Sequence, residues 1–111
     1  MITIDKLKAF GADTETGLAR CLGKEDFYLK MVKMGLENQN FSLLEQALAE
    51  KNLEKAFELA HSLKGVIGNL ALTPLYEIVC QLTELLREKT KTDYLPMLKK
   101  LLDLREELQN M

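Results

Sequence analysis

The chain of 111 residues contains one histidine, two cysteines, two prolines and no tryptophan. One histidine and two scattered cysteines offer no ligand spacing for a metal ion, so we expect no metal site. Phosphate-binding loops of the forms G-x-x-x-x-G-K-[ST] and G-x-G-x-x-G are also missing, which argues against a nucleotide site. We therefore expect this chain to bind no cofactor of its own.

Neither charge nor apolar residues are concentrated in one part of the chain. The net charge is −2 with no basic cluster, which argues against nucleic acid as a partner. No apolar run approaches the ~20 residues that a membrane span needs, and residues 1–5 lack the basic and apolar stretches of a secretory signal. We therefore expect a cytoplasmic protein without a membrane segment. Cys21 and Cys80, on different predicted helices, should be reduced there.

The periodicity of the apolar residues predicts an all-α fold. With 47% hydrophobic and 29% charged residues, residues 1–111 are enough for a single domain with its own core. Leucines at helical spacing predict helices over residues 4–10, 14–22, 25–38, 41–51, 53–70, 74–89 and 93–109. Short connections favour an antiparallel up-down four-helix bundle, in which the four longest helices form the core and short N-terminal helices cover one end. We expect a monomer.

Several helix boundaries have their own sequence signals. Thr3, Asp13, Asn52 and Thr73 are the predicted N-caps, because each has a side-chain oxygen and directly precedes a run of helical periodicity. Gly11 is expected to end the first helix, since glycine adopts the left-handed conformation of a helix C-terminus without a steric penalty.

The histidine lies in the stretch A-H-S-L-K-G-V-I-G-N-L, residues 60–70. An apolar stripe with helical spacing runs through this stretch, and at about 100° per residue His61 points roughly a third of a turn away from it. The same outer face contains Lys64, Gly65 and Gly68. Glycine within a helix costs about 1 kcal/mol relative to alanine, so two glycines on this face require a reason.

Two interpretations explain this bare face. In the first, the glycines let another helix pack closely, and His61 is a boundary residue satisfied by Glu58 or by solvent. In the second, His61 is a nucleophile presented to a large partner. Gly65 and Gly68 then admit the backbone of that partner, and Lys64 offers a cation to an anionic group.

The sequence A-H-S-L-K-G-x-x-G resembles the signature of histidine-containing phosphotransfer (HPt) domains, the phosphohistidine carriers of multistep two-component relays. The resemblance spans residues 17–109, with its specific residues between 60 and 78. It implies a four-helix bundle with the phosphorylated histidine exposed midway along one helix, and it favours the second interpretation. Ala71 stands where the family commonly has a glycine, and Val66 and Ile67 where it usually has small residues. These departures bear on the identity of the partner.

The resemblance also implies roles for individual residues. His61 would be the phosphoacceptor, exchanging a phosphoryl group with the aspartate of a response-regulator receiver domain, because a neutral imidazole nitrogen has a nucleophilic lone pair. Lys64 would stabilise the phosphoryl oxygens, and Glu58 or Thr83 could hold the other ring nitrogen. Mg²⁺ is expected on the partner receiver domain, and a sensor or hybrid histidine kinase upstream. The chain would then be a carrier rather than a complete enzyme.

Two other functions fit parts of the sequence. The dimerisation fragment of a histidine kinase also presents a histidine on a helical bundle. That family typically has an acidic residue directly after the histidine and a proline soon afterwards, whereas here Ser62 follows His61 and the next proline is Pro74. A helical interaction or scaffold module would need no reactive histidine at all.

Overall fold

The computed structural model describes all 111 residues, and its helices lie where the periodicity predicts them to within a few residues. Seven helices follow one another: α1 (Ile4–Phe10), α2 (Thr14–Arg20), α3 (Glu25–Leu36), α4 (Asn40–Ala49), α5 (Leu53–Asn69), α6 (Thr73–Arg87) and α7 (Leu95–Gln109). There is no strand, so the all-α prediction is confirmed. None of the helices is both long and apolar enough to cross a membrane.

Side chains cap three of the four helix N-termini at which an N-cap was predicted. Thr3, Asp13 and Asn52 each accept a hydrogen bond from the backbone N–H three residues later, at 3.1–3.2 Å. Each bond satisfies one of the N–H groups that have no partner at the start of a helix. Gly11 ends α1 with a left-handed backbone at φ 111°, as its type and position predict.

The start of α6 differs from the prediction. Thr73 is already the first helical residue, and Leu72 takes the N-cap position without a side-chain hydrogen bond. The preceding turn is set by Ala71, which has a left-handed backbone at φ 57° and whose carbonyl accepts a hydrogen bond from the Asp13 N–H at 2.9 Å. Pro74 remains in the first turn, where its missing N–H breaks no helical hydrogen bond.

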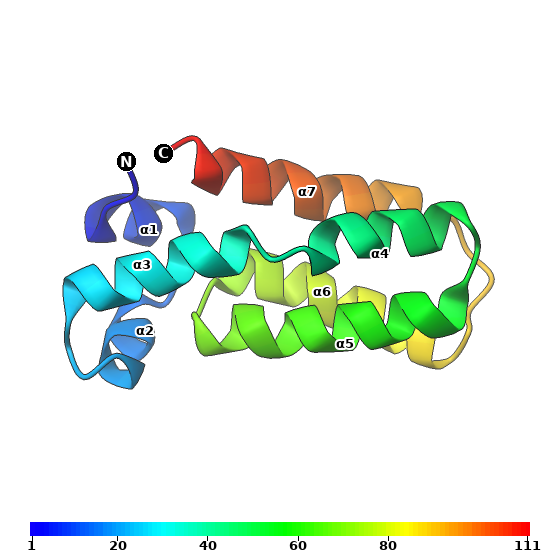
Figure 1. The fold of residues 1–111 in the computed structure, drawn as a ribbon, viewed down its shortest axis with the longest axis horizontal. Coiled ribbons are helices and arrows are strands. Elements are labelled where there is room, and N and C mark those ends of the chain that lie inside the picture. The colour runs from blue at the N-terminus through cyan, green and yellow to red at the C-terminus, as the bar shows by residue number, and fades with distance from the viewer.

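Helices α4, α5, α6 and α7 form an antiparallel up-down bundle, in which each packs on the next and α7 returns to α4 (Figure 1). This arrangement confirms the predicted fold class. Helix α3 continues the line of α4 beyond a short break, and α1 and α2 cover that end (Figure 1). At the break, Asn38 Oδ1 accepts a hydrogen bond from the Asn40 N–H at 2.8 Å. The fourth side of the bundle is therefore α4 extended by α3, rather than one of the four longest helices.

One hydrophobic core of 25 buried residues runs through the molecule, which measures 41 × 23 × 20 Å. Helix α5 contributes most of its predicted apolar stripe, with four residues no more than 1% exposed: Ala56, Ala60, Leu63 and Ile67. Burial of this stripe fixes the rotation of α5 about its own axis and turns the opposite face towards solvent. Cys21 and Cys80 are free thiols.

Candidate functional site

His61 is an exposed side chain midway along α5. Its neighbours Ala60 and Leu63 are fully buried (0% exposed), whereas His61, Ser62 and Gly65 are exposed. The two buried residues hold α5 against the core and leave the imidazole outside it, as the helical periodicity predicts.

The imidazole is oriented by an aromatic contact. Phe57, one turn earlier on α5, stacks on it with the ring centroids 5.8 Å apart and the planes inclined by 19°. Arg87 of α6 places its guanidinium carbon 5.0 Å from the centroid of the Phe57 ring and forms an ion pair with Glu84 at 3.5 Å. Stacking and cation–π contacts are each worth about 1 kcal/mol. Phe57 thus restricts the rotamers of His61 without burying it.

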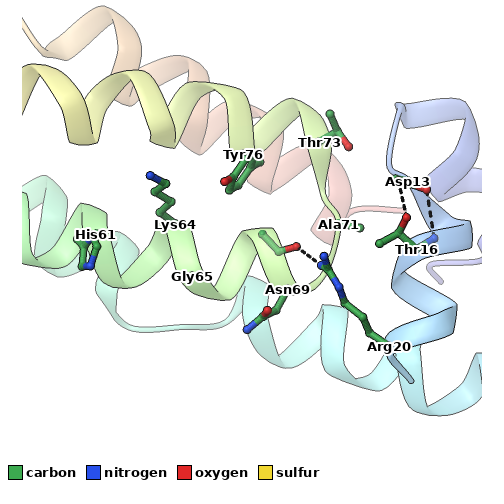
Figure 2. A pocket seen from close by; sticks show the side chains of 11 residues that line it. Asp13, Thr16, Arg20, His61, Lys64, Gly65, Asn69, Ala71, Thr73 and Tyr76 are labelled. Carbon is green, nitrogen blue, oxygen red and sulfur yellow. Dashed lines mark hydrogen bonds between the residues drawn. The ribbon is translucent and has the colours of Figure 1, made fainter. Parts of the chain in front are cut away.

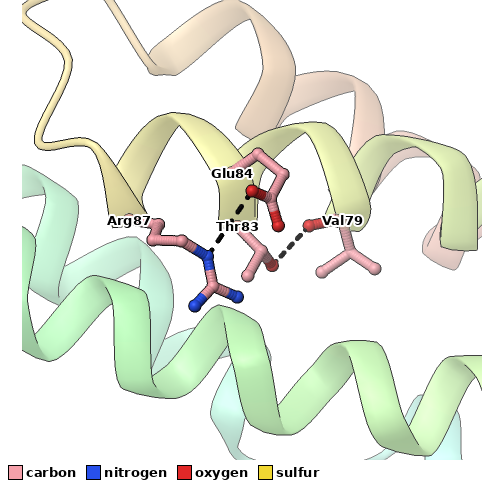
Figure 3. Close-up of polar contacts among 4 residues, drawn as sticks. All are labelled: Val79, Thr83, Glu84 and Arg87. Carbon is pink, nitrogen blue, oxygen red and sulfur yellow. Dashed lines mark hydrogen bonds and ion pairs between the residues drawn. The ribbon is translucent and has the colours of Figure 1, made fainter.

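Neither residue expected to hold the second ring nitrogen does so in this structure. Thr83 is fully buried in α6, and its hydroxyl donates a hydrogen bond to the Val79 carbonyl at 2.6 Å (Figure 3). That bond turns the hydroxyl onto its own helix, and Thr83 makes no hydrogen bond to His61. Glu58 is exposed and belongs to neither ion pair of the protein; its role stays a prediction.

A polar pocket runs from His61 towards the C-terminal end of α5 (Figure 2). Three parts of the chain line it: His61, Lys64, Gly65, Gly68 and Asn69 from α5; Ala71, Thr73 and Tyr76 from the turn before α6 and its first residues; and Asp13, Thr16 and Arg20 from α2 and its cap. Lys64 is half-buried and makes no ion pair, so its ammonium is available to an anion. In Figure 2 its side chain extends towards α6, and its flexible stem lets the ammonium swing towards His61.

The two glycines of the pocket have different surroundings. A Cβ at Gly65 would meet no other heavy atom within 4 Å, so the surface there is open. A Cβ at Gly68 would lie 2.9 Å from Cε1 and 3.3 Å from Cδ1 of Tyr76, so Gly68 makes room for that ring. We expected both glycines to leave space for a partner. Gly65 has the open space that this requires, and its role towards a partner stays a prediction, while Gly68 fits the packing interpretation.

The family model of the Hpt domain matches residues 38–111. The matched residues contain α4 to α7, and therefore the whole four-helix bundle with His61. The chain belongs to the Hpt domain family. Hpt domains are phosphotransfer carriers of two-component signalling that interact with receiver domains and histidine kinases, and they are generally not enzymes. Comparisons with curated proteins and with solved structures found no significant match.

Ala71, one departure of this Hpt domain from its family, lies in a backbone conformation that favours glycine. Hpt domains commonly have a glycine at the position of Ala71, and here that residue has a left-handed backbone at φ 57°. This conformation costs a residue with a Cβ roughly 1–2 kcal/mol and glycine almost nothing. A glycine at this position would avoid the strain that Ala71 tolerates.

Three residues around the site of this Hpt domain were missed by reasoning from the sequence. Phe57 precedes His61 by four residues, a spacing at which helical side chains meet, so this contact had a sequence signal. Arg87 and Arg20 come from other helices, and no local pattern connects either of them with the histidine.

Proposed function

We propose that His61 carries a phosphoryl group in a phosphorelay, accepting it from the aspartate of one receiver domain and donating it to another. The observation that supports this most is the exposed imidazole midway along α5 of an Hpt bundle. It shares one pocket with an open glycine, Gly65, and with Lys64, a lysine without an ion pair.

The transfer is a substitution at phosphorus. The lone pair of one imidazole nitrogen attacks the aspartyl phosphate, the N–P bond forms as the P–O bond to the carboxyl group breaks, and the carboxylate leaves with the bonding electrons. The second ring nitrogen keeps its proton. Catalysis of such a step consists mainly of positioning and charge neutralisation, which we assign to Phe57 and Lys64 on this side of the interface. No three His, Cys, Asp or Glu side chains converge on a metal site here, and we assign Mg²⁺ to acidic residues of the receiver domain.

Two donors test the proposed function. The first is a receiver domain from the same organism that holds labelled phosphate, mixed with this protein in Mg²⁺. The second is phosphoramidate, a small phosphoryl donor that needs no docking surface. We expect label on this protein that is lost in acid and kept in base, as a phosphoramidate bond requires. A scaffold module would take no label from either donor, and that outcome would refute the proposal.

Lys64→Ala is expected to slow transfer from the receiver domain about fivefold, with little change in KM. The ammonium is worth about 1 kcal/mol when it neutralises developing phosphoryl charge at a partly exposed site. Single-turnover rates over a range of receiver concentrations separate the two parameters. Lys55→Ala, which removes an exposed charge near the start of the same helix, is the matched control and should react like wild type. An increase in KM alone would show that Lys64 is only a docking contact.

Phe57→Ala is expected to lower the rate of labelling by phosphoramidate two- to tenfold, because the stacked ring that holds His61 is worth about 0.5–1.5 kcal/mol. Phe57→Tyr keeps the stacked ring and should react at the wild-type rate. Both rates are measured well below the thermal midpoint of each variant, since truncation of a half-buried aromatic also destabilises the fold. Equal rates for Phe57→Ala and wild type would show that the stacking does not affect the reaction.

A further inference from the structure

The N-terminal third of the chain is hydrogen-bonded to the C-terminal end of the histidine helix. Arg20 Nη1 donates to the Gly68 carbonyl at 2.6 Å, and the Tyr28 hydroxyl donates to the Leu70 carbonyl at 2.7 Å. The Asp13 N–H donates to the Ala71 carbonyl at 2.9 Å. Gly68 is in the last turn of α5, Leu70 is its C-cap and Ala71 follows, so these bonds fix α2 and α3 against the end of α5 and the turn after it.

Tyr28 makes this attachment rigid. Its side chain is fully buried (0% exposed), and burial raises the pKa of its hydroxyl to about 12. The hydroxyl is therefore protonated at neutral pH and remains a donor to Leu70. Gly17 of α2 packs directly on the Tyr28 ring, where a Cβ would lie 2.4 Å from Cζ. Helix α2 is thus held by packing as well as by hydrogen bonds.

Helix α2 lies outside the residues that the Hpt family model matches, 38–111, yet it forms one wall of the pocket that contains His61 (Figure 2). Arg20 is exposed and makes no ion pair. One of its five donors binds Gly68, and the others are available. Asp13 accepts two hydrogen bonds from Thr16, which are the main cause of the lowered pKa of its carboxyl, with a smaller contribution from the charge of Arg20. It forms no ion pair with Arg20.

The position of Arg20 decides what it can touch. Gly68 follows His61 by seven residues, which at 1.5 Å per residue is about 10 Å along the helix axis. A guanidinium held at the Gly68 carbonyl is therefore too far to contact a phosphoryl group on His61. A partner that brought its aspartate to His61 would cover this position with the surface around that aspartate. The Mg²⁺ that assists transfer at this aspartate is held by carboxylates beside it, so we expect that part of the partner to be acidic.

We propose that Arg20 is a docking residue, which binds a carboxylate of the receiver domain beside its phosphoacceptor aspartate. The N-terminal helices are then part of the partner interface of this protein as well as a cover for the end of the bundle. This inference rests on the proposed function and adds a specificity contact from outside the Hpt bundle.

Arg20→Gln and Arg20→Lys together test the role of the charge. Glutamine keeps a donor for the Gly68 carbonyl but removes the charge, whereas lysine keeps the charge. We expect Arg20→Gln to raise the KM for a phosphorylated receiver domain about fivefold at ~50 mM salt, with an unchanged maximal rate. The difference from wild type should shrink at ~500 mM salt, because screening weakens an exposed contact. Arg20→Lys should stay within about twofold of wild type.

Two controls separate docking from folding and from chemistry. Lys100→Gln removes an exposed charge from α7, which packs on α6, α4 and α3 rather than on α5, and it should leave KM unchanged. Labelling by phosphoramidate should be equal in Arg20→Gln and wild type, since that donor needs no docking. Denaturant midpoints of all variants identify any increase in KM that comes from a destabilised fold.

The possible results of this experiment are distinct. If wild type takes label from the receiver domain and Arg20→Gln has the same KM, or a lower maximal rate at the same KM, the docking role is refuted while the proposed function stands. If Arg20→Lys fails as badly as Arg20→Gln, the side chain acts through its geometry at Gly68 and the proposed charge contact is refuted. If wild type takes no label from either donor, the proposed function fails and the docking role fails with it.

Discussion

Replacement of His61 by glutamine is expected to abolish acid-labile phosphorylation completely. His61 is the one histidine of the chain, so no second imidazole can take over its reaction. Its side chain is exposed, and its one aromatic contact is with Phe57. Glutamine is a good helix former, and surface substitutions usually change stability by less than ~0.5 kcal/mol. The thermal midpoint should therefore stay within a few degrees of the wild-type value.

The measurement compares His61→Gln with wild type after incubation with labelled phosphoramidate and with a labelled receiver domain. Circular dichroism of the same samples confirms that the helices are intact. Acid-labile label on the variant would contradict the assignment of His61, and with it the proposed carrier function.

The second large effect is expected at Gly65, where Gly65→Gln should raise the KM for the receiver domain at least tenfold. The outer surface at this position is open, since a Cβ would meet nothing within 4 Å, so the fold has room for the new side chain. A docked partner does not have that room, because the side chain would project one turn from His61. Glutamine is also the better helix former, and the free energy of unfolding should rise by up to about 1 kcal/mol.

Gly68→Gln is the matched comparison for Gly65→Gln, because it adds the same side chain one turn further along α5. Here the Cβ would lie 2.9 Å from the Tyr76 ring, and overpacking of this kind costs about 1–3 kcal/mol. Denaturant midpoints should therefore move in opposite directions for the two variants. If both variants lose stability equally, Gly65 also packs against the rest of the protein, and the interpretation that it leaves room for a partner is wrong.

The features that could be predicted from the sequence depend on neighbours along the helix. The apolar stripe of α5 fixes which face is buried, so the exposure of His61 follows from periodicity alone. Asp13 and Asn52 act as caps because a short polar side chain reaches an N–H three residues later. Such interactions lie within one or two turns, and the order of residues specifies them.

The features that could not be predicted depend on contacts between helices. Gly68 faces the Tyr76 ring because the turn at Ala71 brings the start of α6 against the end of α5. A helical wheel of α5 places Gly68 on the histidine face without showing what opposes it. In the same way the family resemblance assigns Thr83 to the imidazole, yet its hydroxyl donates a hydrogen bond within its own helix. The contribution of Arg20 required the complete fold.

The positions of the two chain ends have a practical consequence for tethering this protein. The N-terminal ammonium of Met1 donates a hydrogen bond to the Met111 carbonyl, and Lys6 Nζ donates to the carbonyls of both residues at 3.0 and 3.1 Å. Both ends thus meet beside the end of α7 (Figure 1), and α7 is diagonal to α5 in the bundle. An affinity tag, a surface anchor or a fused domain at either end would be attached on the side of the bundle away from His61. Immobilisation through either end should therefore leave the histidine face accessible to a receiver domain in a binding experiment.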